Sequence, residues 1–250
     1  MLYSRKTNVI FGILQIILYL AFLTLDLTDS APNFSVAIKY TIIIVCFCYA
    51  FFTKSASRSI LFLSVLLHKL AMFFTVLSDL FLLVLDIQLL GILTFILVQI
   101  FYGLRISIVK KHDLVKEFTT RIIIQAVLTL FIAFILKQIN VLINPLLVAT
   151  IFYFIYILTN TILAIMAVAT SAKYKRPSMK LFTIGMVLFL LCDINVGLFN
   201  MASFITMPEN IYVVVYSLSS ILMWTFYAPS QVLLAYSTQA IAKENVNESV

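Results

Sequence analysis

Eight long apolar runs dominate this chain of 250 residues and restrict the environments in which it can fold. A helix that crosses a bilayer needs about 20 consecutive, mostly apolar residues. Runs of that length lie near residues 9–27, 35–53, 60–85, 87–105, 119–138, 145–169, 180–203 and 211–237. Because 63% of the residues are hydrophobic and only 11% are charged, a soluble domain of this size could not bury its apolar surface. The sequence therefore predicts an integral, multi-pass membrane protein.

The pattern within the runs favours helices over strands. The runs are too long for barrel strands and lack the alternation of polar and apolar residues that such strands show. The breaks between them, such as DLTDSAPN and SIVKKHDLVKEF, leave no room for a second, soluble domain. We therefore expect an all-α fold, a bundle of eight transmembrane helices that forms one integral membrane domain over residues 1–250. In a bacterial source its location would be the cell membrane.

The lysines and arginines predict the orientation of this bundle. With the N-terminus in the cytoplasm, Lys39 and Lys137 fall outside, Lys69 falls within a span, and the other 14 of the 17 basic residues fall in cytoplasmic segments. Those 14 are Arg5, Lys6, Lys54, Arg58, Arg105, Lys110, Lys111, Lys116, Arg121, Lys173, Lys175, Arg176, Lys180 and Lys243. Cytoplasmic loops of membrane proteins carry such an excess, so we expect both termini in the cytoplasm. The net charge of +7 then reflects loop anchoring at anionic lipids and gives no reason to expect nucleic acid.

Two acids, Asp79 and Asp193, lie inside apolar runs. A carboxylate in hydrocarbon costs several kcal/mol, so intramembrane acids face the protein interior and usually have a function. In the expected topology, Asp79 lies about seven residues, or roughly 10 Å, short of the outer end marked by Asp86. Asp193 lies about 13 residues, or roughly 20 Å, beyond the inner anchor Lys180. Both acids then lie between the midplane and the outer leaflet, where they can share one cavity.

A shared site would give the two carboxyls different roles. Two acids in one low-dielectric cavity cannot both ionise cheaply, so one keeps its proton and the other stays charged. A general acid and a general base require this arrangement. The alternative is structural: each acid separately forms a hydrogen bond to a neighbouring helix. The spacing alone leaves both interpretations open.

Other polar residues in the runs are candidates for lining the same cavity. Gln99 and Tyr102 are three residues apart and share a helix face, and Tyr227 and Gln231, four residues apart, share one in the last run. The alternative for each of them is an ordinary hydrogen bond between helices. Lys39 opens the second run and could attract a phosphate headgroup, or it could extend to the membrane interface without any ligand.

Several familiar chemistries are excluded. The chain has two histidines, so a zinc site with three histidine ligands cannot form. It contains no phosphate-binding glycine loop and no Gly-x-Ser-x-Gly nucleophile motif. We expect neither a metal nor a cofactor.

Short motifs in five of the runs carry a family resemblance. They are IKYTIII, SDLFLLV, LGILTFILVQIFYGL, LFLLCDINVGL and FYAPSQVLLAYS. In this order they resemble the YhhN-like lysoplasmalogenase family of multi-span membrane proteins, over about residues 35–105 and 180–237. The chain departs from the family pattern at three positions: Gln99 replaces a histidine, Ser78 a glycine and Tyr40 a proline.

The resemblance implies hydrolysis of the vinyl ether bond of lysoplasmalogens, with a fatty aldehyde and a glycerophospho-base as products. It implies Asp79 and Asp193 as the catalytic residues, a lysophospholipid as the substrate, and no partner beyond the substrate and membrane lipids. The substrate-binding candidates are Lys39, Gln99, Tyr102, Tyr227 and Gln231. The missing histidine removes a possible proton relay. The alternatives are a transporter, which would also place acids near the midplane, and a non-catalytic lipid-binding protein.

Overall fold

Eight helices account for nearly all of the chain that the computed structural model describes, which is residues 5–28, 30–53, 60–109, 114–170, 176–201 and 208–247. Each helix is long and apolar enough to cross a membrane, and no strand occurs within these ranges. The α-helices are α1 (Arg5–Leu27), α2 (Pro32–Phe52), α3 (Ile60–Asp79), α4 (Gln88–Val109), α5 (Leu114–Gln138), α6 (Pro145–Thr170), α7 (Pro177–Phe199) and α8 (Glu209–Asn247). The expected all-helical fold with eight apolar spans is confirmed.

The helix ends differ from the sequence expectation mainly in the last span. We expected this span to end near residue 237, but α8 continues to Asn247. The apolar pattern marks only the part of a helix that lies in hydrocarbon, so a helix that extends into polar surroundings exceeds it. Pro229 lies inside α8 without interrupting it.

The third span ends in an unusual turn. After α3, residues Leu80–Val84 form a π-helical turn, here η1, in which the Leu85 N–H donates to the Leu80 carbonyl at 3.0 Å. Asp86 then adopts a left-handed conformation with φ of 53°, which Asp tolerates better than most residues. The chain thereby reverses between α3 and α4 within a few residues. Asp79 is the last residue of α3 and directly precedes the π-turn.

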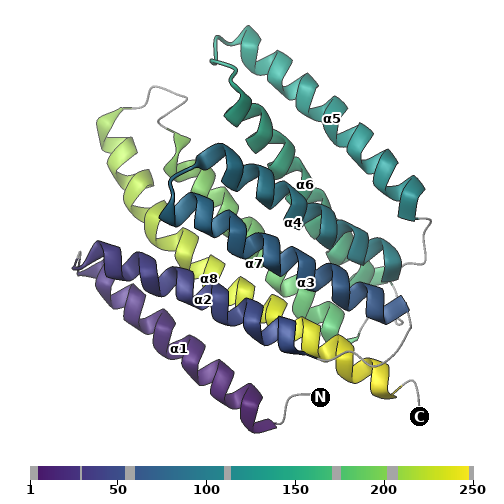
Figure 1. Ribbon diagram of the computed structural model, residues 1–250. Helices are drawn as coiled ribbons and strands as arrows, with labels where there is room; N and C mark the ends of the chain where they lie inside the picture. The colour runs from purple at the N-terminus through teal and green to yellow at the C-terminus, as the bar shows by residue number, and fades with distance from the viewer. Residues whose placement is uncertain are drawn as a thin grey trace.

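The helices run up and down as neighbours along the chain (Figure 1). The most extensive contacts are between α7 and α8 and between α3 and α4, while α4 and α7 also pack on α6. On one flank α1 packs mainly on α2, and on the other α5 packs mainly on α6. The start of α1 and the end of α8 lie at the same end of the bundle (Figure 1).

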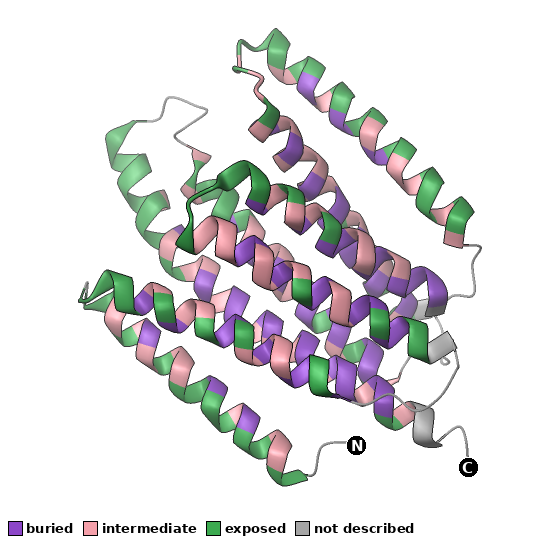
Figure 2. Cartoon of the chain, in the orientation of Figure 1, coloured by how far each residue is buried: buried purple, intermediate pink, exposed green. Residues whose placement is uncertain are grey.

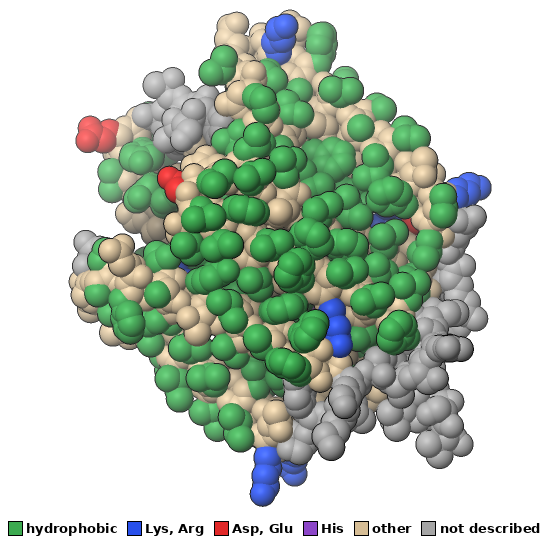
Figure 3. All heavy atoms as spheres, viewed as in Figure 1, with side chains coloured by type: hydrophobic (Ala, Val, Ile, Leu, Met, Phe, Trp, Pro, Cys, Tyr) green, Lys and Arg blue, Asp and Glu red, His purple; other side chains and the backbone are tan. Residues whose placement is uncertain are grey.

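Burial follows this arrangement. Buried residues concentrate on the inner helices, whereas α1 and α5 are largely exposed (Figure 2). Along the middle of α5 the exposed side chains are apolar; Leu130 is 67% exposed and Phe134 60% exposed. Hydrophobic side chains also cover most of the face seen in Figure 3. An apolar exterior of this extent fits contact with lipid tails and does not fit contact with water.

Candidate functional site

Asp79 is held by a tyrosine of the last helix. Asp79 is 3% exposed, and the Tyr227 hydroxyl of α8 donates to its Oδ2 at 2.7 Å. Tyr227 is itself buried, and its ring packs on Phe189 and Trp224. The sequence indicated Tyr227 as a cavity residue, and the structure makes it the direct partner of Asp79.

Asp193 has an equivalent partner on a different helix. It is half-buried on α7, and the Tyr153 hydroxyl of α6 donates to its Oδ2 at 2.7 Å. The sequence analysis did not select Tyr153, because the sixth apolar run contains no acid to draw attention to it. A usable signal was present: Tyr153, Tyr156 and Asn160 recur at intervals of three and four residues, which places them on one face of the helix.

The two acid–tyrosine pairs lie in one region of the bundle. Ring contacts connect Tyr227 to Phe189, Phe189 to Phe95, and Phe95 to Tyr153, with centroid distances of 5.5, 5.8 and 5.7 Å. The two carboxyls are close enough for their charges to interact. The structure thus brings together residues from α3, α6, α7 and α8. Catalysis by the two acids stays a prediction.

Gln99 lies beside this region but has a partner of its own. Asn160 of α6 donates to the Gln99 backbone carbonyl at 2.7 Å and to its Oε1 at 3.2 Å. The Gln99 Nε2 lies near the Tyr153 hydroxyl without meeting the geometry of a hydrogen bond. Asn160 therefore fixes the Gln99 side chain next to the partner of Asp193. Tyr40 of α2 is close enough to Asp79 for an electrostatic interaction.

Lys39 lies at the outer edge of the same region in an ion pair. Its Nζ is 2.7 Å from Asp26 Oδ2, and it lies 5.1 Å from the ring centroid of Trp224 and 5.6 Å from that of Phe22. Trp224 in turn packs on Tyr227, at 5.3 Å between ring centroids, so Lys39 is connected to the Asp79 pair through aromatic contacts. A phosphate bound by Lys39 would share the ammonium with Asp26.

Tyr102 and Gln231 are buried, and their contacts lie elsewhere. The Tyr102 ring packs against His68 and Phe182, at 5.3 and 5.4 Å between centroids. Gln231 donates to its neighbour Ser230 at 3.3 Å. The hydrogen bonds described for these two residues connect neither of them to Asp79 or Asp193. A role for them in substrate binding stays a prediction.

A buried cation is the feature that the sequence interpretation missed. We counted Arg105 as a cytoplasmic anchor, but it is 2% exposed between α3, α4, α7 and α8. Its Nη1 donates to Ser237 Oγ at 3.2 Å and lies 2.6 Å from His68 Nδ1, and its guanidinium lies 4.0 Å from the centroid of the Phe182 ring. His68 is fully buried as the partner of Arg105.

In the part of the chain that the structure describes, no group of three or more His, Cys, Asp or Glu side chains is placed to hold an ion. Comparisons of the chain with protein-family models, with curated proteins and with solved structures find no match.

Proposed function

We propose that the chain is an intramembrane hydrolase of the lysoplasmalogenase type, which cleaves the vinyl ether bond of a lysophospholipid with its paired aspartates. One observation carries the proposal: two intramembrane carboxyls, each held by one tyrosine hydroxyl at 2.7 Å, lie in one aromatic region. Intramembrane acids are retained where they act on a substrate or ion. The short motifs of the second, third, fourth, seventh and eighth spans add the resemblance to the YhhN-like family.

The proposed reaction needs one protonated and one ionised carboxyl. The protonated acid delivers its proton to the vinyl carbon distal to the ether oxygen, which leaves an oxocarbenium ion. The ionised acid stabilises this cation and removes a proton from the attacking water, so that a hemiacetal forms. The hemiacetal collapses to a fatty aldehyde and a glycerol hydroxyl. One water is consumed, and neither a metal nor a cofactor takes part.

The aliphatic tail and the phosphate of the substrate bind to different parts of the region. The aliphatic tail lies among apolar side chains, and the phosphate lies toward Lys39 at the outer edge of the region. With both termini in the cytoplasm, this edge faces the outer leaflet, so substrate enters from that side.

Release of aldehyde from lysoplasmalogen by the purified, full-length protein tests the proposal. We expect turnover with at least one of the choline and ethanolamine headgroups, and no release from the corresponding 1-acyl lysophospholipid, which lacks the vinyl ether. If the protein releases no aldehyde from lysoplasmalogen with either headgroup, the proposal of a hydrolase is wrong.

A second candidate, a non-catalytic lipid-binding protein, is favoured by the state of Gln99. A glutamine cannot relay a proton as histidine does, and here Asn160 fixes it by two hydrogen bonds. Saturable binding of lysoplasmalogen without turnover would select this candidate.

A further inference from the structure

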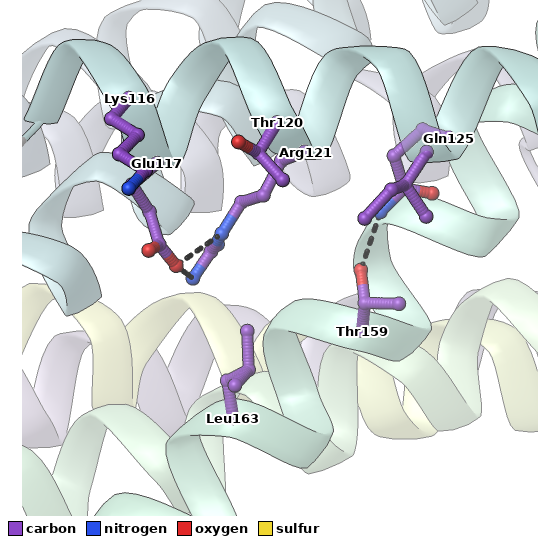
Figure 4. A pocket seen from close by; sticks show the side chains of 8 residues that line it. Lys116, Glu117, Thr120, Arg121, Gln125, Thr159 and Leu163 are labelled. Carbon is purple, nitrogen blue, oxygen red and sulfur yellow. Dashed lines mark hydrogen bonds and ion pairs between the residues drawn. The ribbon is translucent and has the colours of Figure 1, made fainter.

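A pocket lies between α5 and α6, on the flank of the bundle away from α1 and α2. It is open on one side and has a volume of about 700 Å³. Its charged end is formed by Lys116, Glu117 and Arg121 of α5, and Leu163 lies opposite them on α6 (Figure 4). At its other end the Gln125 amide donates to Thr159 Oγ1 at 2.8 Å and joins the two helices. The function proposed above makes no use of this pocket.

Contacts to Glu117 and Asn160 hold the Arg121 guanidinium in place. Its Nε and Nη2 each lie 3.0 Å from Glu117 Oε1, and its Nη1 donates to Asn160 Oδ1 at 3.2 Å. A guanidinium has five N–H groups, and these contacts use three of them. Gly103 of α4 makes room for the arrangement, because a Cβ there would lie 2.9 Å from both Arg121 Nη1 and Asn160 Oδ1.

The charge of the pocket selects an anion. Among the described residues that line the pocket, Lys116 and Arg121 contribute two positive charges and Glu117 contributes one negative charge. A guanidinium fixed by protein contacts binds phosphate through paired hydrogen bonds, and a nearby lysine adds a point charge. Basic pockets between transmembrane helices are typical binding sites for anionic lipid headgroups.

The exposed apolar surface beside the pocket favours a lipid as the ligand. Next to the charged end, α5 exposes Ile124 and Val127 at 52% and 60%, and these side chains are positioned to contact hydrocarbon. An occupant therefore meets a cationic end and an apolar face on the same helix. A phospholipid offers the matching pair, a phosphate and acyl chains.

We propose that this pocket binds the headgroup of an anionic membrane phospholipid, with the phosphate at Arg121 and Lys116 and the acyl chains along the exposed face of α5. The site is separate from the aspartate region and does not depend on the hydrolase proposal. The lipid comes from the leaflet in which α5 begins.

Ligand-dependent thermal stability and native mass spectrometry of the full-length protein in neutral detergent test the charge preference. The probes are dioleoyl phosphatidylglycerol, dioleoyl phosphatidylcholine and inorganic phosphate. We expect phosphatidylglycerol to bind at least about tenfold more tightly than phosphatidylcholine, because the choline cation offsets the phosphate charge beside Lys116 and Arg121. Lys116→Gln should remove most of this preference, whereas Lys180→Gln, an exposed lysine at the start of α7, should keep it.

A steric pair of variants tests the location without changing a charge. Leu163→Trp fills the pocket and should weaken phosphatidylglycerol binding, whereas Ile162→Trp places the same side chain on the 46% exposed face of α6 and should not. Equal binding of the two lipids, or equal behaviour of the two tryptophan variants, overturns the site. If inorganic phosphate stabilises the protein as much as phosphatidylglycerol does, the occupant is a free anion, and the proposal of a lipid is wrong.

Discussion

At the residue scale, Asp79 and Asp193 have the same kind of hydrogen-bond partner. Each carboxyl lies in an apolar helix, and each accepts a tyrosine hydroxyl from a different helix at 2.7 Å. A hydroxyl can donate to an ionised carboxylate and can accept from a protonated carboxyl. Either acid can therefore fill either role in the proposed reaction, and the tyrosines hold the carboxyl orientations in both states.

Substitution of either acid tests its proposed role. Asp79→Asn and Asp193→Asn should each lower aldehyde release at least ~100-fold, since a positioned acid or base supplies about that much. Asparagine keeps the size of the side chain, so the amount of protein in the membrane should barely change. Asp86→Asn is the matched control, because residue 86 lies in the turn after η1, where asparagine also tolerates a positive φ. Near-wild-type release by either site variant would exclude that acid as a catalyst.

The hydrogen bond from the Tyr227 hydroxyl to Asp79 should contribute to the stability of the protein. Tyr227→Phe leaves the buried Asp79 carboxyl without its donor, which should cost about 1 to 3 kcal/mol of unfolding free energy. Combining it with Asp79→Leu, which removes the acceptor, in a double-mutant cycle should show a coupling above about 0.5 kcal/mol in the same measurement. Tyr216→Phe on the same helix is the control, since Tyr216 is 40% exposed. Additive effects of the two site variants would contradict the interaction.

At the element scale, the close pair α7 and α8 determines how Asp193 and Tyr227 are placed. Gly185 lets the helices approach: a Cβ there would lie 2.9 Å from Leu234 Cγ and 3.2 Å from the Ser230 carbonyl oxygen. Small residues allow this approach in membrane bundles, where close packing replaces the hydrophobic effect between helices.

Two glycines of α7 provide a matched test of this packing. Gly185→Ala should destabilise the protein by about 1 to 3 kcal/mol through overpacking, because one of the crowded atoms belongs to the backbone of α8. Gly197→Ala adds the same methyl where nothing lies within 4 Å, so it should be neutral or stabilise by up to about 1 kcal/mol through helix propensity. Unfolding in detergent measures both, and equal effects would contradict a close contact at Gly185.

At the scale of the whole molecule, the exterior is apolar and the interior contains polar side chains. Among the buried polar residues are Asp79, Gln99, Arg105 and Asn160. Such residues cost free energy in hydrocarbon unless neighbouring helices supply partners. The bundle supplies them through tyrosine, asparagine, serine and histidine side chains.

The orientation of the molecule in the membrane is a further prediction. Removing the buried Arg105 from the cytoplasmic group still leaves 13 basic residues inside against two outside, so the asymmetry holds. Reporter fusions at residues 54, 111, 175 and the C-terminus should all report the cytoplasm, and fusions at 140 and 208 should report the outside. A reversed signal at any one position would contradict this topology.

The sequence by itself determined the class of fold and most of its elements. The length of an apolar run and the charges that flank it are properties of a single segment. Each segment inserts in the bilayer according to its own length and flanking charges. The sequence also indicated Asp79 and Asp193, because an acid in an apolar run is visible without any partner. The resemblance to the YhhN-like family stays a prediction from short motifs.

Only the tertiary structure decided which residues meet. Tyr153 as the partner of Asp193, Asp26 as the partner of Lys39, and the burial of Arg105 beside His68 all depend on contacts between helices. In eight apolar helices, periodicity distinguishes a buried face poorly, because the face toward lipid is as hydrophobic as the face toward the core. The rotation of each helix, and with it every polar contact described above, is therefore a property of the packed bundle.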